Sequence, residues 1–296
     1  MKKTVFTGSG VAIITPFNEN GIDFESFGKL VDFHLENSTD AIIVCGTTGE
    51  AATMPDNEHL SAIEFVVKRV NKRIPVIAGT GSNDTVHGVK LSKEAERLGA
   101  DALLVVTPYY NKANKQGLVN HFKMIADSVQ IPVILYNVPS RTGMNIALDV
   151  LEELKDIDNI VGIKEASGNM SYVMELAAKF ADRFDIYSGN DDIIVPVMSV
   201  GGKGVISVLA NVLPKETHDI CQLYLDGKCE ESRKLQLKLL DLINSLFCEV
   251  NPIPVKTAIN LMGLNGGILR MPLYEMAPNN KERLIKDLKA TGVKLQ

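Results

Sequence analysis

The sequence lacks several features that would place the protein in a specialised class. No apolar run approaches the roughly 18 residues that a membrane-spanning helix needs, and no apolar segment follows the two lysines near the start, so neither a membrane partner nor a secretory signal is expected. The formal net charge of −5 shows no basic excess, which disfavours nucleic acids as partners. What remains is ordinary globular composition, 45% hydrophobic and 23% charged.

Cysteine and histidine are also sparse. The four cysteines form no Cys-x-x-Cys pair and are too few for a disulfide framework, so a reducing, cytoplasmic location is expected. The five histidines are scattered over helix-like segments and give little support to a metal site. The segment 79–84 matches neither a P-loop nor a dinucleotide fingerprint, and the Gly-rich 201–204 is more typical of the entry to a strand.

Short apolar runs rich in valine and isoleucine alternate with longer amphipathic stretches. Each run has strand length and is bounded by Gly, Pro, Asn or Asp. Continuous rather than alternating apolar strands are typical of a parallel sheet covered on both faces. The eight predicted strands are 10–17, 41–46, 76–81, 102–108, 133–139, 160–166, 185–190 and 204–210.

The number of these strands and the helices between them favour one fold of the α/β class. Amphipathic stretches such as 23–37 and 56–73 predict helices between the strands. Eight such units in about 200 residues favour a (β/α)8 TIM barrel over an open doubly wound sheet. The strand signal stops after residue 210, so we expect a barrel over residues 1–212 and a C-terminal helical region over 213–296.

A single lysine, Lys164, stands at the end of the apolar run "IVGIK", where an ammonium is costly to bury. Functional groups of a barrel lie at the C-terminal ends of its strands. Because side chains alternate along a strand, the small residues Gly162 and Ala166 flank Lys164 on one face and leave room for a ligand. Val161 and Glu165 are expected on the other face, so Glu165 is not the ion-pair partner of Lys164.

Burial disfavours the charged form of a lysine, and a neutral amine attacks carbonyl carbons to form Schiff bases. The alternative is a lysine whose ammonium reaches a loop carboxylate while its stem helps packing. This strand alone leaves both interpretations open.

The next motif is "YNVPSRTG" (136–143). Tyr136 ends the preceding strand, so its hydroxyl is expected within reach of Lys164 and suited to passing protons. The alternative is a core tyrosine bonded to a carbonyl. Arg141 follows a Pro-Ser turn, where a planar guanidinium suits a carboxylate; the alternative is a solvated loop arginine.

Two further motifs follow predicted strands. In "GTTGEA", the hydroxyls of Thr47 and Thr48 suit a small carboxylate, and Thr47 could extend a relay from Tyr136; the alternative is an ordinary turn with Thr48 as a helix cap. In "TPYYNK", Tyr109 and Tyr110 form an aromatic pair on a loop, which is expected to bury against another subunit.

Taken in order, five motifs resemble the dihydrodipicolinate synthase family of pyruvate-dependent class I aldolases: "GTTGEA", "TPYYNK", "YNVPSRTG", "GIKEASGN" and "GGKGVISVLANV". The likeness runs nearly end to end and includes "NPIPVKTAINLMG" (251–263). It implies that pyruvate, held as an imine, condenses with L-aspartate 4-semialdehyde to give 4-hydroxy-tetrahydrodipicolinate, the entry step to diaminopimelate and lysine. It also implies no metal and no organic cofactor, since the lysine is the electron sink.

The resemblance assigns roles to individual residues. Lys164 matches the imine-forming lysine, and Tyr136 matches the tyrosine that shuttles its protons. Thr47 matches the threonine that links this tyrosine to a second one, Tyr110, which enters from the neighbouring subunit of a tight dimer. Two such dimers form a homotetramer. The substrate pocket is matched by Thr48 for the pyruvate carboxylate, Arg141 for the semialdehyde, and the main chain of Gly189 and Ile206.

One regulatory site departs from the family pattern. Lysine-inhibited members have serine, histidine and glutamate where this chain has Ala51, Asp56 and His87. An imidazole cannot supply the carboxylate that pairs with the effector's ammonium, so lysine feedback is expected to be weak or absent. The full set of matching positions is Ala51, Ala52, Asp56, His59, Asn83, His87 and Tyr109.

Alternative functions remain open at this stage. A sister aldolase that cleaves N-acetylneuraminate or a 2-keto-3-deoxy sugar acid would use the same lysine and tyrosine, although Arg141 suits a short semialdehyde with its own carboxylate. A non-catalytic, pyruvate-binding regulatory barrel would need a broken relay, yet all four relay residues are present. A pyridoxal-phosphate enzyme with "GGKG" as phosphate site is a further alternative.

Overall fold

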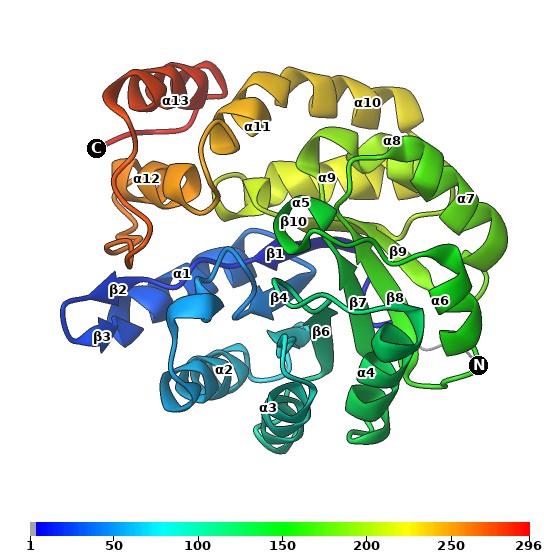
Figure 1. Cartoon of the computed structure of the whole chain (residues 1–296). Coiled ribbons are helices and arrows are strands. Elements are labelled where there is room, and N and C mark those ends of the chain that lie inside the picture. Colours follow the sequence, from blue (N-terminus) through cyan, green and yellow to red (C-terminus); the bar gives the residue numbers. More distant parts are fainter. Residues whose placement is uncertain (1–3) are drawn as a thin grey trace.

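The computed structural model describes residues 4–296 and is shown in Figure 1. Eight parallel strands close into a barrel in the order β1-β10-β9-β8-β7-β6-β5-β4. The predicted (β/α)8 fold is thereby confirmed, and each barrel strand overlaps a predicted one. These strands are β1 (Gly8–Ala12), β4 (Ala41–Val44), β5 (Val76–Gly79), β6 (Ala102–Val106), β7 (Val133–Asn137), β8 (Ile160–Glu165), β9 (Asp185–Ser188) and β10 (Gly204–Ser207).

Helices cover the barrel from outside. Side chains of Asp23, Asp84 and Asn169 accept hydrogen bonds from N–H groups of the first turn of the helix that follows each, which fixes where those helices begin. The helices up to the end of the barrel are α1 (Phe24–Glu36), α2 (Asp56–Val70), α3 (Thr85–Arg97), α4 (Lys115–Asp127), α5 (Pro139–Thr142), α6 (Leu148–Leu154), α7 (Met170–Phe180), α8 (Ile194–Ser199) and α9 (Pro214–Leu225). Single turns form η1 (Ala51–Thr53), η2 (Asp191–Ile193) and η3 (Leu209–Asn211), and a small hairpin joins β2 (Phe17–Asn18) to β3 (Gly21–Ile22).

The chain ends in four further helices, α10 (Cys229–Lys238), α11 (Leu240–Leu246), α12 (Ile253–Leu261) and α13 (Pro278–Ala290). Helix α9 packs against β1 and β10, whereas α13 packs against α11 and α12. In Figure 1, α12 and α13 lie together, and the loop between them reaches the β2–β3 hairpin, where the Ile268 N–H donates to the Phe17 backbone oxygen at 2.9 Å. No helix within residues 4–296 has both the length and the apolar character of a membrane span.

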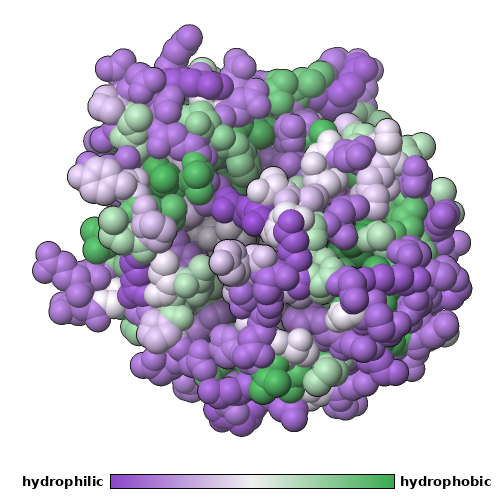
Figure 2. All heavy atoms as spheres, viewed as in Figure 1, coloured by the Kyte–Doolittle hydropathy of each residue, from purple (hydrophilic) through white to green (hydrophobic). Residues whose placement is uncertain are grey.

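Apolar side chains form two layers, as expected for strands buried on both faces. The larger cluster lies between strands and helices and includes Ile42 and Ile63. A smaller one fills the barrel and includes Ile43, Ile134 and Tyr187. Figure 2 shows that hydrophilic residues cover most of the visible face and that apolar ones form separate small patches. The barrel is therefore a packed core, and its chemistry belongs at the strand ends.

One predicted side-chain direction is wrong. Ile160 pairs with Val133 and Gly162 pairs with Ile134, so Val161 is the extra residue of a β-bulge. Val161 consequently joins the cluster inside the barrel and does not share the outer face with Glu165. A period-2 pattern cannot reveal such an insertion, because the bulge depends on the partner strand.

Candidate active site

Lys164 lies near the C-terminal end of β8, where only 6% of its surface is exposed. Tyr136 is its Cα partner on β7, and the Lys164 Nζ lies 4.5 Å from the centroid of the Tyr136 ring. Tyr136 is also buried inside the barrel. The structure thus brings together the two residues that the strand ends predicted as neighbours.

Glu165 points away from Lys164, as the strand alternation predicts. Its carboxylate accepts hydrogen bonds from Asn137 Nδ2 and from the backbone N–H of Ser167, each at 2.6 Å. Burial raises the pKa of Glu165, and these hydrogen bonds oppose that shift. Its carboxylate is thus held outside the barrel interior by partners of its own.

Asp191 is a buried carboxylate that the motif analysis did not single out. Its Oδ2 accepts hydrogen bonds from the backbone N–H groups of Val208 and Leu209, at 3.0 and 2.9 Å. Burial raises the pKa of Asp191, while hydrogen bonds, first that from Ser207, and the positive charge of Lys164 oppose the shift. The only sequence signal was the polar run "SGNDD" (188–192), which begins at the last residue of β9.

A cavity of about 380 Å³ opens at the C-terminal ends of the strands between β4 and β7. Thr47, Tyr136 and Arg141 line it together with Tyr109. Within residues 4–296, no hydrogen bond joins the hydroxyls of Thr47 and Tyr136, so these two members of the expected relay line one cavity but are not connected in this chain alone.

Thr48 and Arg141 share a contact in the C-terminal region. The Thr48 side chain is buried, and its hydroxyl accepts a hydrogen bond from Asn251 Nδ2 at 3.0 Å. Arg141 Nη2 donates to the backbone oxygen of the same Asn251, also at 3.0 Å. Asn251 was missed because only the fold brings it to a turn 203 residues earlier in the chain.

Two glycines near Lys164 mark close backbone approaches. A Cβ on Gly189 would lie 2.5 Å from the Cβ of Ala166, and the Gly189 N–H donates to the backbone oxygen of Glu165 at 2.7 Å. A Cβ on Gly162 would lie 2.7 Å from the backbone oxygen of Asp185. The space beside Gly162 is thus filled by β9, and the expected room for a ligand is not there. Ile206, also expected at the pocket, is fully buried in the barrel interior.

Comparison with known proteins decides the family. The profile of the Dihydrodipicolinate synthetase family matches residues 5–291. The chain belongs to this family. It is 61% identical over 293 residues to a 4-hydroxy-tetrahydrodipicolinate synthase of Caldicellulosiruptor saccharolyticus, covering 99% of both chains, and 56% identical to the enzyme of that name from Acetivibrio thermocellus, covering 99% of this chain and 100% of the relative. A crystal structure of dihydrodipicolinate synthase from Aquifex aeolicus is 46% identical, with a TM-score of 0.96 over 98% of this chain and 100% of that one.

Membership of the dihydrodipicolinate synthetase family confirms the family and the lyase class predicted from the sequence. Tyr110, however, lies outside the cavity of its own chain in this family member. Its side chain is 93% exposed, on a loop held by hydrogen bonds from Asn83 Nδ2 to the Tyr109 oxygen and from Asn111 Nδ2 to the Asn83 oxygen. The structure of one chain therefore brings Lys164, Tyr136 and Thr47 to one end of the barrel and leaves Tyr110 on the surface.

Of the seven positions that match the family's effector site, all but Asn83 line the same cavity. Asp56 pairs with His87 Nε2 at 2.8 Å and with Lys90 Nζ at 3.0 Å. These hydrogen bonds, that from Lys90 first, lower the pKa of Asp56. His59 Nε2 lies 2.8 Å from the Gly79 oxygen. Ala51 and Ala52 complete this end of the cavity, while Asn83 holds the neighbouring loop.

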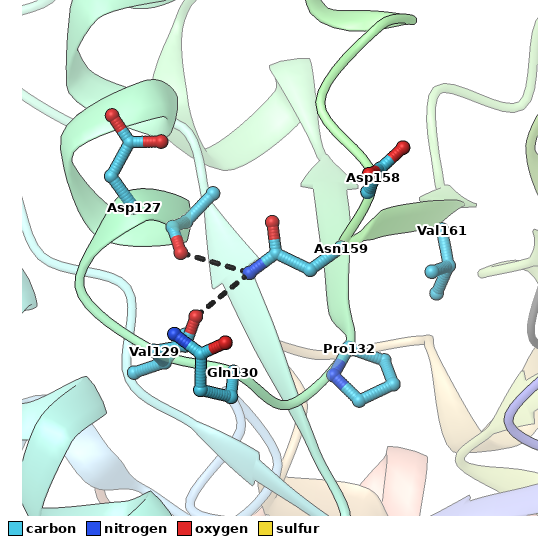
Figure 3. Close-up of a pocket in the computed structure, with 8 residues that line it drawn as sticks. Asp127, Val129, Gln130, Pro132, Asp158, Asn159 and Val161 are labelled. Carbon is cyan, nitrogen blue, oxygen red and sulfur yellow. Dashed lines mark hydrogen bonds between the residues drawn. The ribbon is translucent and has the colours of Figure 1, made fainter.

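A second hollow, of about 570 Å³, lies at the opposite end of the barrel, where β7 and β8 begin (Figure 3). In it, Asn159 Nδ2 donates to the oxygens of Ala126 and Val129, at 2.8 and 3.1 Å. These bonds tie the loop before β8 to the end of α4. None of the predicted site residues lines this hollow, and the N-terminal face of such a barrel serves stability rather than catalysis.

Proposed function

We propose that this chain condenses pyruvate with L-aspartate 4-semialdehyde to 4-hydroxy-tetrahydrodipicolinate through a Schiff base on Lys164, with no metal or organic cofactor. The observation that carries the proposal is a buried lysine beside a tyrosine at the C-terminal end of the barrel in a member of this family. The proposal rests on the names of relatives 56% and 61% identical over nearly the whole chain.

The chemistry follows from a primary amine. The Lys164 nitrogen attacks the keto carbon of pyruvate, and loss of water gives the imine. Removal of a methyl proton gives an enamine, whose carbon attacks the aldehyde carbon of the second substrate. The amino group of that substrate then attacks the imine carbon, which closes the ring and releases the lysine.

The surrounding residues take the roles that their positions allow. Tyr136, next to the Lys164 amine, moves protons during formation and breakdown of the imine. Thr47 passes them on toward Tyr110 of a neighbouring subunit. Thr48 and the turn that carries it bind the pyruvate carboxylate, and Arg141 binds the carboxylate of the semialdehyde. The main chain of Gly189 and of Ile206 lines the pocket.

We further propose a homotetramer, built as a dimer of dimers, in the cytoplasm. The exposed Tyr110 supports a dimer in which this loop is covered. The four free thiols among the described residues support a reducing compartment. A division of the chain after residue 212 is supported by α13, which packs on α11 and α12, although α9 lies on the barrel.

Reduction with borohydride in the presence of pyruvate tests the function. The imine becomes a stable secondary amine, and peptide mass mapping is expected to place the added mass on the peptide that holds Lys164. The Lys164→Ala variant is expected to show no adduct and to lose turnover by several orders of magnitude, because the covalent route is closed. Persisting turnover without modification of Lys164 would refute the proposal.

A further inference from the structure

The turn that carries Thr47 and Thr48 ends at Glu50, whose backbone is strained and whose side chain is buried. Its φ is +56°, in the left-handed region that non-glycine residues rarely adopt. Its backbone N–H donates to the Thr47 oxygen at 3.1 Å, so the position of Glu50 is directly tied to that of Thr47. Such a conformation persists only where surrounding contacts hold it.

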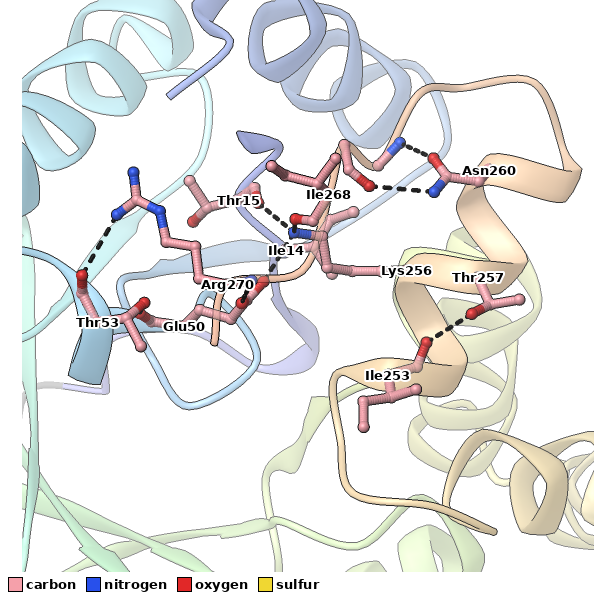
Figure 4. Close-up of polar contacts among 12 residues, drawn as sticks. Ile14, Thr15, Glu50, Thr53, Ile253, Lys256, Thr257, Asn260, Ile268 and Arg270 are labelled. Atoms are coloured by element: carbon pink, nitrogen blue, oxygen red, sulfur yellow. Dashed lines mark hydrogen bonds and ion pairs between the residues drawn. The ribbon is translucent and has the colours of Figure 1, made fainter. Parts of the chain in front are cut away.

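The contacts that hold Glu50 come from the C-terminal region (Figure 4). Glu50 Oε1 lies 2.7 Å from Lys256 Nζ of α12, and Oε2 accepts from the backbone N–H of Arg270 at 3.1 Å. The two side chains of the Glu50–Lys256 pair are each only 1% exposed. A fully buried ion pair thus joins the Thr47–Thr48 turn to a helix that begins two hundred residues later.

Lys256 is also bound on its remaining sides. Its Nζ donates to the backbone oxygens of Thr15 and Ile268, at 3.1 and 2.5 Å, and lies 4.8 Å from the centroid of the Phe17 ring. All of its ammonium hydrogens are therefore directed at fixed acceptors, one of them the Glu50 carboxylate. This geometry defines the place of Glu50 far more narrowly than an apolar contact would.

Stability alone is a weak explanation for this pair. Removing two charges from water offsets most of their attraction, and apolar residues of similar volume often stabilise a fold as well. What the pair adds is a fixed geometry. The Lys256 ammonium has three acceptors in fixed places, so it holds the Glu50 carboxylate in one arrangement. A second link points the same way, since Asn251 of the same region donates to the Thr48 hydroxyl.

We propose that Glu50 and Lys256 are positioning residues, through which the C-terminal helices fix the Thr47–Thr48 turn in the geometry that binds the substrate carboxylate. This inference rests on the proposed function, in which that turn receives pyruvate. The pair contacts no substrate and acts through the two threonines.

Two variants disturb the pair in different ways. Glu50→Asp keeps both charges and withdraws the carboxylate by one methylene. The double variant Glu50→Gln, Lys256→Met removes both charges with little change in volume, so no uncompensated charge is left in the core. Leu288→Ala is the matched control, because this fully buried residue belongs to α13, which packs on α11 and α12 in the same region.

Two measurements separate positioning from stability. Hydrogen exchange followed by mass spectrometry reports the amides of residues 46–53, and initial rates give KM for pyruvate. In both pair variants, the amides of this peptide are expected to exchange faster, and KM for pyruvate is expected to rise about tenfold. A tenfold rise is the size expected for the loss of one hydrogen bond to a charged group. Leu288→Ala is expected to lower the melting temperature while leaving both quantities at wild-type values.

A folded pair variant with unchanged exchange and unchanged KM would overturn the inference. The same holds if Leu288→Ala changes both quantities as much as the pair variants do, since general destabilisation would then explain them. Exchange needs no turnover. If the unchanged protein formed no pyruvate imine while the pair variants still exchanged faster, the proposed function would be wrong, and the pair would keep only its role in holding the Thr47–Thr48 turn.

Discussion

At the scale of single residues, His87 places an imidazole in the cavity where lysine-inhibited members of the family have a carboxylate. Its two ring nitrogens lie 2.8 Å from an Asp56 oxygen and 3.1 Å from the Ser82 hydroxyl, so both are occupied. Lys90 binds the other oxygen of Asp56. An incoming ammonium would therefore meet a carboxylate that already has two partners, one of them a cation.

We expect L-lysine to inhibit this chain weakly or not at all. The measurement is the rate of condensation as L-lysine is raised into the millimolar range. His87→Glu places two carboxylates side by side, which attracts an ammonium, so this variant is expected to gain sensitivity to lysine. Inhibition of the unchanged protein by micromolar lysine would contradict the prediction.

Residues differ in how far the sequence predicts them. Lys164 and Tyr136 could be predicted as neighbours because both end strands that are consecutive in the barrel, and alternation then sets their direction. Val161 could not, because the bulge depends on how β8 pairs with β7. Asn251 and Lys256 could not either, since their partners are about two hundred residues away and no local pattern links them.

At the scale of elements, helix α1 buries a histidine that has little access to water. His34 is 1% exposed, and its Nδ1 lies 3.1 Å from the Thr39 hydroxyl. Burial lowers the pKa of His34 to about 3, and similarly lowers the pKa of His121 in α4 to about 4. The amphipathic pattern of residues 23–37 predicted α1, but it did not say that the His34 ring stays neutral.

The free energy of unfolding depends on pH because the unfolded and folded states bind a proton on His34 at different pH values. The unfolded chain protonates His34 near pH 6.5, whereas the folded chain does so only near pH 3, so acid favours unfolding between these values. His34→Gln is therefore expected to lose about 2 kcal/mol less free energy of unfolding than the wild type between pH 7 and pH 5. Urea unfolding at the two pH values measures it.

A second histidine serves as control with the opposite sign. A hydrogen bond to Asp40 raises the pKa of His218 in α9, so its contribution to stability is present in acid and is lost as pH rises through its folded value. His218→Gln should then lose more stability than the wild type on acidification. Equal pH dependence in all three proteins would show that neither ring titrates as its surroundings require.

At the scale of the whole molecule, the proposed proton relay is not complete within one chain. Tyr110 has a φ of +72°, so its backbone is strained. Its side chain is 93% exposed, so an aromatic ring faces solvent. Within the described chain, Thr47 lines the cavity without reaching any tyrosine hydroxyl by a hydrogen bond. An arrangement in which two chains exchange Tyr110 loops would cover both rings and complete both relays at once.

Mixing two inactive variants tests this exchange. Lys164→Ala and Tyr110→Phe chains, unfolded and refolded together, form hybrid dimers in which one site receives an intact lysine from one chain and an intact tyrosine from the other. With equal amounts, half of the dimers are hybrids and each has one good site, so the mixture is expected to regain about a quarter of wild-type activity. If Tyr110 served its own chain, every site would keep one defect, and the mixture would stay at the mean of the two parents refolded separately.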